Sequence, residues 1–437
     1  MSFSRRHFLA AGAGLAASLP AGAFAAATRR ARPKVVIVGA GYGGSATALY
    51  LKRWAPQAEV TVIEPQARFV SCPMSNTVIG GMNRLEDISF PYDYVRKAVD
   101  RFINDTVTAI DPAQRTVTTA KGATLAYDRL ILSPGVELQF DRIEGYDAEA
   151  QKRVKHAWKA GADQTTALRR QLEAMPDGGV FVMSIPMAPF RCPPAPYERA
   201  SLVAQYFKRH KPKSKVIILD ANDGMVSKKA LFTTAWQKYY GYGTDGSLID
   251  YRPNNRVEAL DLAAMQVSSE FDEVKGDVIN LIPPMRAGAI TAAIGARTGD
   301  DGTWCPIDNL TMESLEVPNV HILGDAILSN LSKAAALANN SGKLCAWALS
   351  EIFAGRQPDP APVVTSTCYS LGSDQAAFHV ATVFRYAPAT KTMEVQPGSG
   401  VSDQESAQEL KELRGWARNI WSDTLGLPRN YRFTNRF

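Results

Sequence analysis

The chain has 437 residues, of which 46% are hydrophobic and 21% charged, and its formal net charge at pH 7 is +6. This length and composition exclude a disordered or fibrous protein and predict roughly two to three globular domains. Basic residues are not clustered densely enough to indicate a nucleic-acid-binding protein, although exposed lysines and arginines could steer an acidic protein partner.

The N-terminus predicts export. Ser4–Leu9 contains paired arginines, an apolar stretch of small residues runs from Phe8 to Pro20, and Ala23–Ala25 offers a small-x-small cleavage site. The stretch is shorter than the about 20 residues of a membrane-spanning helix. We therefore expect residues 1–25 to be a twin-arginine signal peptide of a periplasmic protein without membrane association; a Sec signal with a chance arginine pair is the alternative.

A strand, helix, strand unit follows. Apolar patterns predict a strand over Lys34–Val38, a helix over Ser45–Ala55 and a strand over Glu59–Glu64, and a further buried strand over Tyr127–Ser133. This alternation is typical of a parallel sheet covered by helices. We assign residues 33–150 to the first part of a dinucleotide-binding domain.

A glycine fingerprint lies between the first strand and the first helix. Gly39 permits a tight turn, Gly41 allows the backbone to approach a pyrophosphate, and Gly44 allows the helix and strand to pack closely. The helix N-terminus supplies N–H donors and a positive dipole end. Glu64, 20 residues after Gly44 at the end of the next strand, is predicted to accept hydrogen bonds from the adenosine ribose.

Residues 151–300 repeat the alternation. The patterns predict strands over Gly179–Ser184 and Lys215–Asp220, and helices over Tyr197–Arg209 and Lys228–Tyr239. The turn after the first of these strands lacks glycine and is rich in proline, which has no N–H to offer a phosphate. We expect a second Rossmann-like domain whose nicotinamide site is degenerate.

The chain then returns to the first domain, which we extend over residues 301–360. A strand is expected over Asn319–Leu323 and a helix near Lys333–Phe353. The segment Val320–Asp325 and the strand Tyr127–Gly135 resemble two segments of FAD-dependent disulfide-reductase-like enzymes. This resemblance implies that Gly324 and Asp325 bind FAD.

Prolines near residue 360 separate a C-terminal region, residues 361–437. Phe378–Tyr386 alternates like a strand, and Ala407–Trp421 is an amphipathic helix pattern. The apolar face of this helix suits packing on the protein's own core or, alternatively, contact with a membrane surface.

The five cysteines form no C-x-x-C pair, which excludes covalent haem on this chain and argues against a zinc site; they are Cys72, Cys192, Cys305, Cys345 and Cys368. Cys192 lies in the proline-rich turn, and Cys305 lies shortly before the return to the first domain. Spacing alone leaves two interpretations of this pair, a structural disulfide or a redox-active one.

Five segments resemble the flavoprotein subunit of flavocytochrome c sulfide dehydrogenase, and the similarity runs from about Pro33 to the end. The chain departs from that family at Pro73, where some relatives are expected to have Tyr, and matches it only partly over residues 338–343. The segments are Ser71–Asn76, Phe190–Arg199, Trp304–Asp308, Thr367–Leu371 and Trp416–Gly426.

The resemblance implies a fold of two Rossmann-like, glutathione-reductase-type dinucleotide-binding domains plus an α+β C-terminal interface domain. It implies a sulfide dehydrogenase in which a Cys192–Cys305 disulfide oxidises sulfide beside FAD, with Cys72 covalently bonded to the flavin. A c-type cytochrome partner, which carries the haem, would accept the electrons. An ordinary loop thiol is the alternative for Cys72, while Cys345 and Cys368 are expected to be small core residues.

Glu198, at the start of a predicted helix, is a candidate proton acceptor if burial raises its pKa, or alternatively a first-turn acid that complements the helix dipole. Three rival functions stay open. They are a sulfide:quinone reductase-like enzyme at the membrane surface, a pyridine-nucleotide disulfide reductase, and a non-catalytic exported flavoprotein that assists sulfur oxidation.

Overall fold

The computed structural model describes residues 32–434, and the predicted signal peptide, residues 1–25, lies outside the described residues. The first major sheet has five parallel strands, in the order β20 (Val320–Ile322), β9 (Arg129–Leu132), β1 (Lys34–Val38), β2 (Glu59–Ile63) and β5 (Arg101–Ile103). Its central strands are rich in Val and Ile because both faces are covered, as parallel sheets require. The return strand β20 confirms the predicted re-entry of the chain into this sheet.

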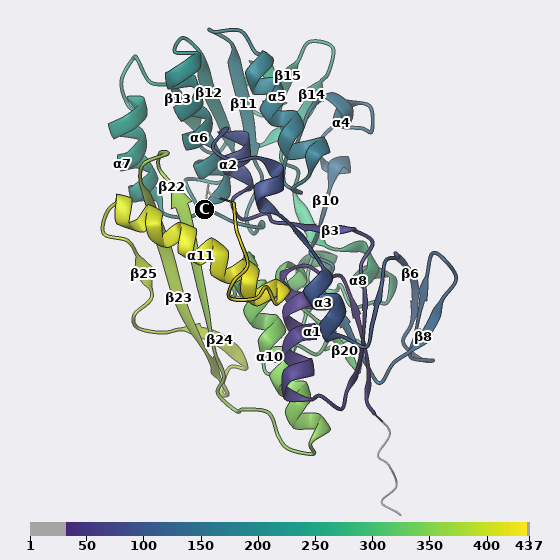
Figure 1. Ribbon diagram of the computed structural model, residues 1–437. Helices are drawn as coiled ribbons and strands as arrows, with labels where there is room; N and C mark the ends of the chain where they lie inside the picture. Colours follow the sequence, from purple (N-terminus) through teal and green to yellow (C-terminus); the bar gives the residue numbers. More distant parts are fainter. Residues whose placement is uncertain (1–31, 435–437) are drawn as a thin grey trace, which may run out of the picture. The chain divides into compact units, whose positions relative to one another are not determined.

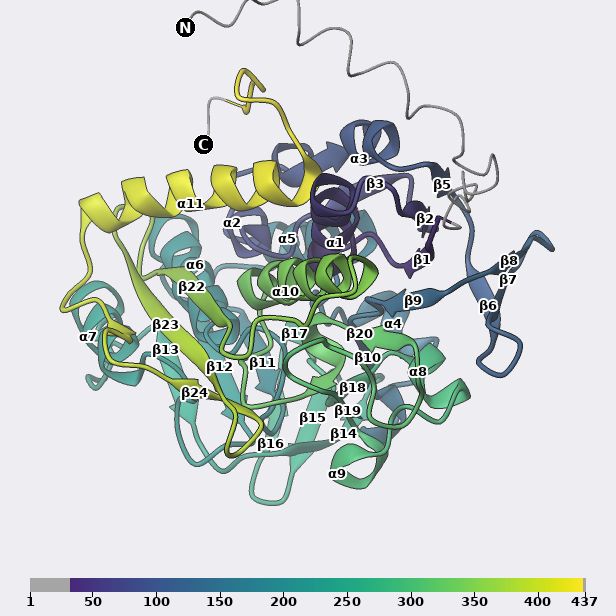
Figure 2. The same cartoon turned by 90° about the horizontal axis from the view of Figure 1, so that it is seen from below.

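Two long helices cover one face of the first sheet. α1 (Tyr42–Trp54) and α10 (Ala335–Phe353) lie side by side although they are far apart in the sequence (Figures 1 and 2). The Thr47 hydroxyl donates to the Gly342 carbonyl at 3.2 Å, and a Cβ at Gly342 would stand 2.4 Å from the Gly43 carbonyl oxygen. This close approach requires glycine in α10 and fixes the start of α1 against it.

The second major sheet has four parallel strands, in the order β13 (Ile249–Arg252), β12 (Lys215–Asp220), β11 (Val180–Ile185) and β17 (Val278–Asn280). Helix α6 (Ala195–His210) follows β11, and α7 (Lys229–Tyr240) follows β12. α7 ends where Gly241 adopts the left-handed conformation, with φ of 68°, which suits glycine after a helix.

Shorter elements complete these two regions, and sequence patterns did not predict most of them. Each major sheet is accompanied by a three-stranded antiparallel sheet. These are β6 (Val107–Asp111), β7 (Thr116–Thr119) and β8 (Thr124–Ala126), and β14 (Val257–Asp261), β15 (Gln266–Ser269) and β16 (Glu273–Lys275). Other short pieces are β3 (Arg68–Val70), α2 (Ser75–Ile79), β4 (Ser89–Pro91), α3 (Asp93–Ala98), β10 (Val136–Leu138), α4 (Ala150–Arg153), α5 (Ala167–Ala174), β18 (Met285–Ala287), α8 (Ala289–Ala293), β19 (Cys305–Pro306) and β21 (Ile327–Leu328).

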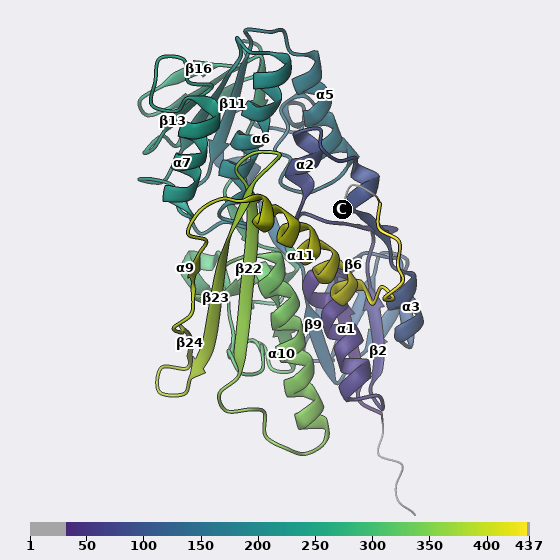
Figure 3. The same cartoon turned by 60° about the vertical axis from the view of Figure 1, so that its left-hand side comes forward.

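The C-terminal region is an antiparallel sheet of β22 (Val363–Leu371), β23 (Ala377–Ala387), β24 (Thr392–Val395) and β25 (Gly400–Val401). Figure 3 shows its long strands beside α10, with α11 (Ala407–Leu425) crossing nearby. On α11, Leu413, Ala417 and Trp421 are buried against the protein. The apolar face of this helix therefore packs on the protein's own core, as the first of the two interpretations predicted.

Between residues 32 and 434, no helix combines the length and the apolar character that are needed to cross a lipid bilayer.

Candidate functional site

A cavity of about 540 Å³ lies at the carboxyl ends of the first sheet, where ligands of open parallel sheets bind. Strands β1, β2, β9 and β20 end at its wall and deliver, respectively, the glycine loop, Glu64, Ser133 and Asp325. The loop after β3 contributes Cys72, and the loop after β11 contributes Arg191 and Cys192. All of the sequence-predicted cofactor residues except Gly44 thus line one cavity.

The glycine loop has the geometry of a phosphate cradle. Gly39 adopts φ of 91°, and a Cβ there would stand 2.5 Å from the Ser133 carbonyl oxygen. At Gly41, a Cβ would meet no atom within 4 Å, so the backbone faces open space in the cavity wall. Because α1 begins directly after Gly41, the loop offers backbone N–H groups and a helix N-terminus to an anion.

Glu64 is buried at the cavity wall and partly engaged by the backbone. Its carboxylate accepts hydrogen bonds from the Ala40 N–H at 2.8 Å and from the Gln66 N–H at 2.7 Å. Each carboxylate oxygen can accept a further bond. Glu64 is therefore held in position, with remaining capacity for the hydroxyl groups of a ribose.

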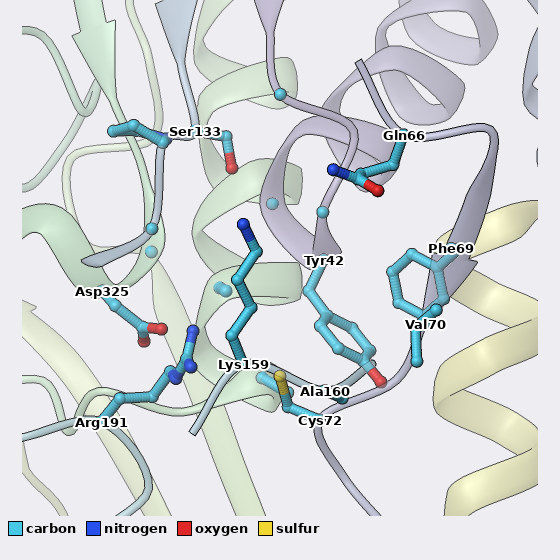
Figure 4. A pocket seen from close by; sticks show the side chains of 18 of the residues that line it. Tyr42, Gln66, Phe69, Val70, Cys72, Ser133, Lys159, Ala160, Arg191 and Asp325 are labelled. Carbon is cyan, nitrogen blue, oxygen red and sulfur yellow. The ribbon is translucent and has the colours of Figure 1, made fainter. Parts of the chain in front are cut away.

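Asp325 supplies a second acceptor on the far side of the cavity. Its Oδ1 atom is buried and has no hydrogen-bond partner among residues 32–434. Burial raises the pKa of this carboxyl, while the charges of Arg191 and Lys333 oppose the rise. Figure 4 shows the Arg191 side chain directed toward Asp325 within the cavity.

These observations fit FAD. The open glycine loop matches the pyrophosphate, and Glu64 after β2 matches the ribose. The buried Oδ1 atom of Asp325, which has no partner among the described residues, matches the ribityl chain. The second sheet offers no comparable cradle, because the loop after β11 is lined with Pro186, Pro189, Pro193 and Pro194.

The Cys72 sulfur points into the same cavity (Figure 4). The neighbouring Ser71 hydroxyl contacts the Tyr42 hydroxyl at 2.7 Å and accepts a bond from the Trp421 indole N–H at 2.9 Å. Burial raises the pKa of the Tyr42 phenol far above its ordinary value, so this group stays neutral. The loop that carries Cys72 is thereby fixed between α1 and α11.

Cys192 also lines the cavity, on a loop held in a left-handed conformation with φ of 59°. Its N–H donates to the Lys333 carbonyl oxygen at 2.7 Å. Enclosure by the protein raises the pKa of the Cys192 thiol, and the next largest influence is the charge of Cys368 on β22. The Cys368 thiol is affected in the same way by burial.

The structure does not confirm the predicted pair of Cys192 with Cys305. All five cysteines lie in the described part of the chain and are free thiols. Cys305 is fully buried, is not among the residues lining the cavity, and has Thr291, Arg297 and Lys333 as its neighbours. It lies on β19, which pairs with β21, whereas Cys192 lies in the loop after β11.

Cys368, which we expected to be a small core residue, is the thiol that influences Cys192 most strongly. β22 brings Cys368 toward α6, the helix that follows the Cys192 loop. The structure thus places a thiol from the second sheet and a thiol from the C-terminal sheet in one neighbourhood.

Glu198, in the first turn of α6, belongs to this neighbourhood as well. Its carboxylate accepts bonds from the Asn76 side-chain amide at 2.7 Å and from the Leu371 N–H at 3.0 Å. Burial raises its pKa, and these two bonds oppose the rise. The charge of Glu198 raises the pKa of the Cys192 thiol, and the charge of Lys228 lowers the pKa of Glu198, so this carboxyl lies near Cys192 and Lys228.

Sequence reasoning overlooked three polar residues that hold this site: Asn76, Arg199 and Lys228. The Arg199 guanidinium is buried and donates to Asn76 Oδ1 at 3.1 Å and to Asn280 Oδ1 at 2.7 Å. Burial lowers its pKa to about 9. The available signal was a charged residue on the buried stripe of a predicted amphipathic helix, which requires polar partners.

Three family models match the chain. The model described as Pyridine nucleotide-disulphide oxidoreductase matches residues 33–175. Sulfide dehydrogenase [flavocytochrome c] flavoprotein chain, central, matches residues 165–283. Flavocytochrome c sulphide dehydrogenase, flavin-binding, matches residues 360–425.

Two curated relatives illustrate the similarity. The flavocytochrome c sulfide dehydrogenase flavoprotein chain of Chlorobaculum thiosulfatiphilum is 51% identical over 45 residues, which cover 10% of this chain and 94% of the relative. The mitochondrial sulfide:quinone oxidoreductase of Dictyostelium discoideum is 25% identical over 313 residues, which cover 69% of this chain and 67% of the relative.

Among solved structures, the sulfide:quinone oxidoreductase of Aquifex aeolicus superimposes with a TM-score of 0.71 at 19% sequence identity. The match covers 90% of this chain and 92% of the other. This likeness establishes the fold.

Proposed function

Because the chain belongs to the family of flavocytochrome c sulfide dehydrogenase flavoproteins, we propose that it oxidises sulfide in the periplasm and passes the electrons to a c-type cytochrome partner. The observation that carries this proposal is the placing of Cys192 at the wall of the dinucleotide cavity, with Cys368 as its thiol neighbour. Two neighbouring thiols can alternate between a dithiol and a disulfide.

In the proposed reaction, Cys192 and Cys368 begin as a disulfide. Hydrosulfide attacks one of the two sulfurs, a new sulfur–sulfur bond forms as a persulfide on that cysteine, and the bond between the cysteines breaks. The electron pair of the broken bond stays on the other cysteine as a thiolate. This pairing replaces the predicted one with Cys305.

Bound FAD would supply the two-electron acceptor for that thiolate. We propose that Gly39, Gly41 and the α1 N-terminus hold its pyrophosphate, with Gly44 allowing α1 to pack against that loop. Glu64 would hold the adenosine ribose, and Gly324 and Asp325 would hold the ribityl region. Cys72 would anchor the cofactor covalently. A Cys72→Ser protein is then expected to release its flavin upon acid denaturation, whereas the parent retains the flavin on the polypeptide.

Glu198 is the proposed proton acceptor for hydrogen sulfide. A carboxylate serves as a base near neutral pH only if its pKa is raised, and burial raises that of Glu198. Its hydrogen bonds to Asn76 and Leu371 leave it beside the thiols from which attack would start. If Glu198 only complemented the dipole of α6, its carboxyl would not need to be buried.

A sulfide:quinone reductase-like activity is the second candidate. It is supported by relatives that are named as sulfide:quinone oxidoreductase or sulfide-quinone reductase. The buried apolar face of α11 favours the cytochrome acceptor, because this helix then has no exposed apolar stripe for a membrane surface.

The test is anaerobic titration of the oxidised, flavin-loaded protein with sulfide, followed by addition of either a c-type cytochrome or a soluble quinone. Flavin bleaching by sulfide and faster reduction of the cytochrome are expected. Cys192→Ser and Cys368→Ser proteins should lose at least about a hundredfold in kcat/KM, because either change removes the disulfide. Cys305→Ser is the matched control and should keep its activity.

Loss of activity in Cys305→Ser together with full activity in Cys368→Ser would show that Cys192 pairs with Cys305 instead. Reduction of the quinone but not of the cytochrome would contradict the proposed electron acceptor.

A further inference from the structure

Lys228 is a buried cation next to the thiol neighbourhood. Its Nζ atom donates to the Cys368 carbonyl oxygen at 2.7 Å and to the Ser370 hydroxyl at 2.9 Å. It also lies 5.4 Å from the centre of the Phe378 ring. Because an ammonium group has three N–H donors, one donor remains after these two bonds.

The backbone at Lys228 shows that helix stability does not explain the residue. Lys228 is the N-cap of α7, adopts φ of 53° and ψ of 35°, and makes no side-chain capping bond. Glycine or asparagine suits this left-handed conformation better, and Ser, Thr, Asp or Asn suits an N-cap better. A lysine at this position is consistent with a role for its side chain.

Four ionisable groups act on the ammonium through their charge, and each is an anion when ionised. They are Cys368 on β22, Cys192 in the loop before α6, Glu198 on α6 and Glu409 on α11. The charge of Lys228 is in turn the largest influence that favours ionisation of the Cys368 thiol, and it also favours ionisation of the Cys192 thiol.

Building on the proposed function, we propose that Lys228 is a positioning residue that stabilises the thiolate form of the Cys192 and Cys368 pair. Its two hydrogen bonds hold the ammonium at the main chain of Cys368 and at Ser370, where its charge favours ionisation of the Cys368 thiol. When the disulfide opens, the departing sulfur keeps the electron pair as a thiolate, and the ammonium offsets that charge without giving up its proton. A sulfur that leaves as a stabilised thiolate leaves faster.

The role has a limited pH range. Burial lowers the pKa of Lys228 to about 8, and the neighbouring anions oppose this change. The ammonium is therefore charged at neutral pH and loses its proton as the pH rises through about 8, where its effect on the thiols ends.

The experiment measures the thiols directly. The full-length protein is reduced, and alkylation of Cys192 and Cys368 by iodoacetamide is followed by mass spectrometry across pH 6 to 10, roughly the range in which thiols titrate. In Lys228→Met, we expect alkylation near neutral pH to slow by about tenfold or more, and we expect this slowing to disappear above about pH 8, where Lys228 of the parent loses its charge. Lys228→Arg keeps the charge and should restore most of the rate.

Lys211→Met is the matched control, since Lys211 is another buried lysine whose ammonium bonds two main-chain carbonyls, those of Glu173 and Met175, away from these thiols. An unchanged alkylation rate near neutral pH in Lys228→Met overturns the proposal. So does equal slowing in Lys211→Met, or failure of Lys228→Arg to restore the rate, because either result indicates a structural role. Lys228→Gln serves as a second neutral variant if the Met protein does not fold.

The alkylation measurement does not depend on turnover. If Lys228→Met shows the expected slowing but the parent does not oxidise sulfide, the proposed function alone is refuted. If the parent oxidises sulfide but Lys228→Met shows no slowing, the role of Lys228 alone is refuted.

Discussion

At the scale of single residues, the site depends on groups that are costly to bury and therefore need partners. Arg199 bonds two asparagine side chains, Glu198 bonds an amide and a backbone N–H, and Lys228 bonds a carbonyl and a hydroxyl. Such arrangements with shifted pKa values concentrate at functional sites. Asp325 differs, because its Oδ1 has no partner among the described residues.

The glycine loop gives a residue-scale prediction that separates cofactor binding from folding. At Gly41 an added Cβ faces open space, whereas at Gly44 it would stand 1.8 Å from the Gly39 carbonyl oxygen. Gly41→Ala is expected to leave the unfolding midpoint of the apoprotein unchanged and to weaken FAD binding by about tenfold or more. Gly44→Ala should instead lower the yield of folded protein.

Thermal unfolding of the apoprotein measures the change in stability, and the flavin content after purification measures the change in FAD binding. Equal loss of stability in the two variants would contradict the assignment of Gly41 to the cofactor cradle.

At the scale of elements, α6 and β22 build the thiol site together. α6 follows the Cys192 loop and carries Glu198 and Arg199, and β22 carries Cys368 and the Leu371 N–H that bonds Glu198. α11 closes this region, with Ser406 as a capping residue at its start and Gly426, with φ of 67°, at its end. Rigid elements of this kind hold reactive groups more precisely than loops do.

The cap of α11 can be tested by stability. The Ser406 hydroxyl accepts a bond from the Glu409 N–H at 3.0 Å, so Ser406→Ala leaves that N–H without its acceptor. We expect the free energy of unfolding to fall by about 1 kcal/mol. Urea denaturation measures this change, and Lys411→Ala, an exposed change on the same helix, should stay within about 0.5 kcal/mol of the parent. Equal effects of the two changes would contradict the capping role.

At the scale of the whole molecule, residues from three sheets meet at the site. Asp325 comes from the end of the first sheet, Cys192 from the second sheet, and Cys368 from the C-terminal sheet. Lys333 connects the Cys192 loop to the segment after β20. Its carbonyl oxygen accepts a hydrogen bond from the Cys192 N–H, and its ammonium donates to the carbonyl oxygens of Asp325 and Ile327 at 3.0 and 2.9 Å. The junction therefore contains a buried charge.

That charge couples stability to pH. Burial lowers the pKa of Lys333 to about 8 from an ordinary value of 10.5. Between these values the unfolded chain holds a proton that the folded chain has released, so the Lys333 contribution to stability rises with pH. The free energy of unfolding of the parent, minus that of Lys333→Met, should therefore grow from pH 8 to 10.5 in urea titrations. A difference that stays constant with pH would contradict a lowered pKa.

The sequence by itself determined the main strands and helices and most of the residues that line the dinucleotide cavity. β12 spans Lys215–Asp220 as predicted, and α6 and α10 begin or end within two residues of the expected positions. Apolar periodicity and glycine placement are local properties that act through backbone geometry, so they can be read along the chain. Glu64 and Asp325 reach one cavity because β2 and β20 end at the same sheet edge, and Cys72 reaches it from the loop after β3.

Only the tertiary structure decided which thiols are neighbours. Cys192 and Cys368 are separated by 176 residues, and no local pattern distinguishes Cys368 from Cys305 or Cys345 as the partner. The register of β22 against β23 and the packing of α6 near β22 bring Cys368 toward the Cys192 loop, whereas Cys305 on β19 is buried and is not among the residues lining the cavity. Contacts between distant segments depend on how whole elements pack, and so does the burial that shifts the pKa values of Glu198 and Lys228.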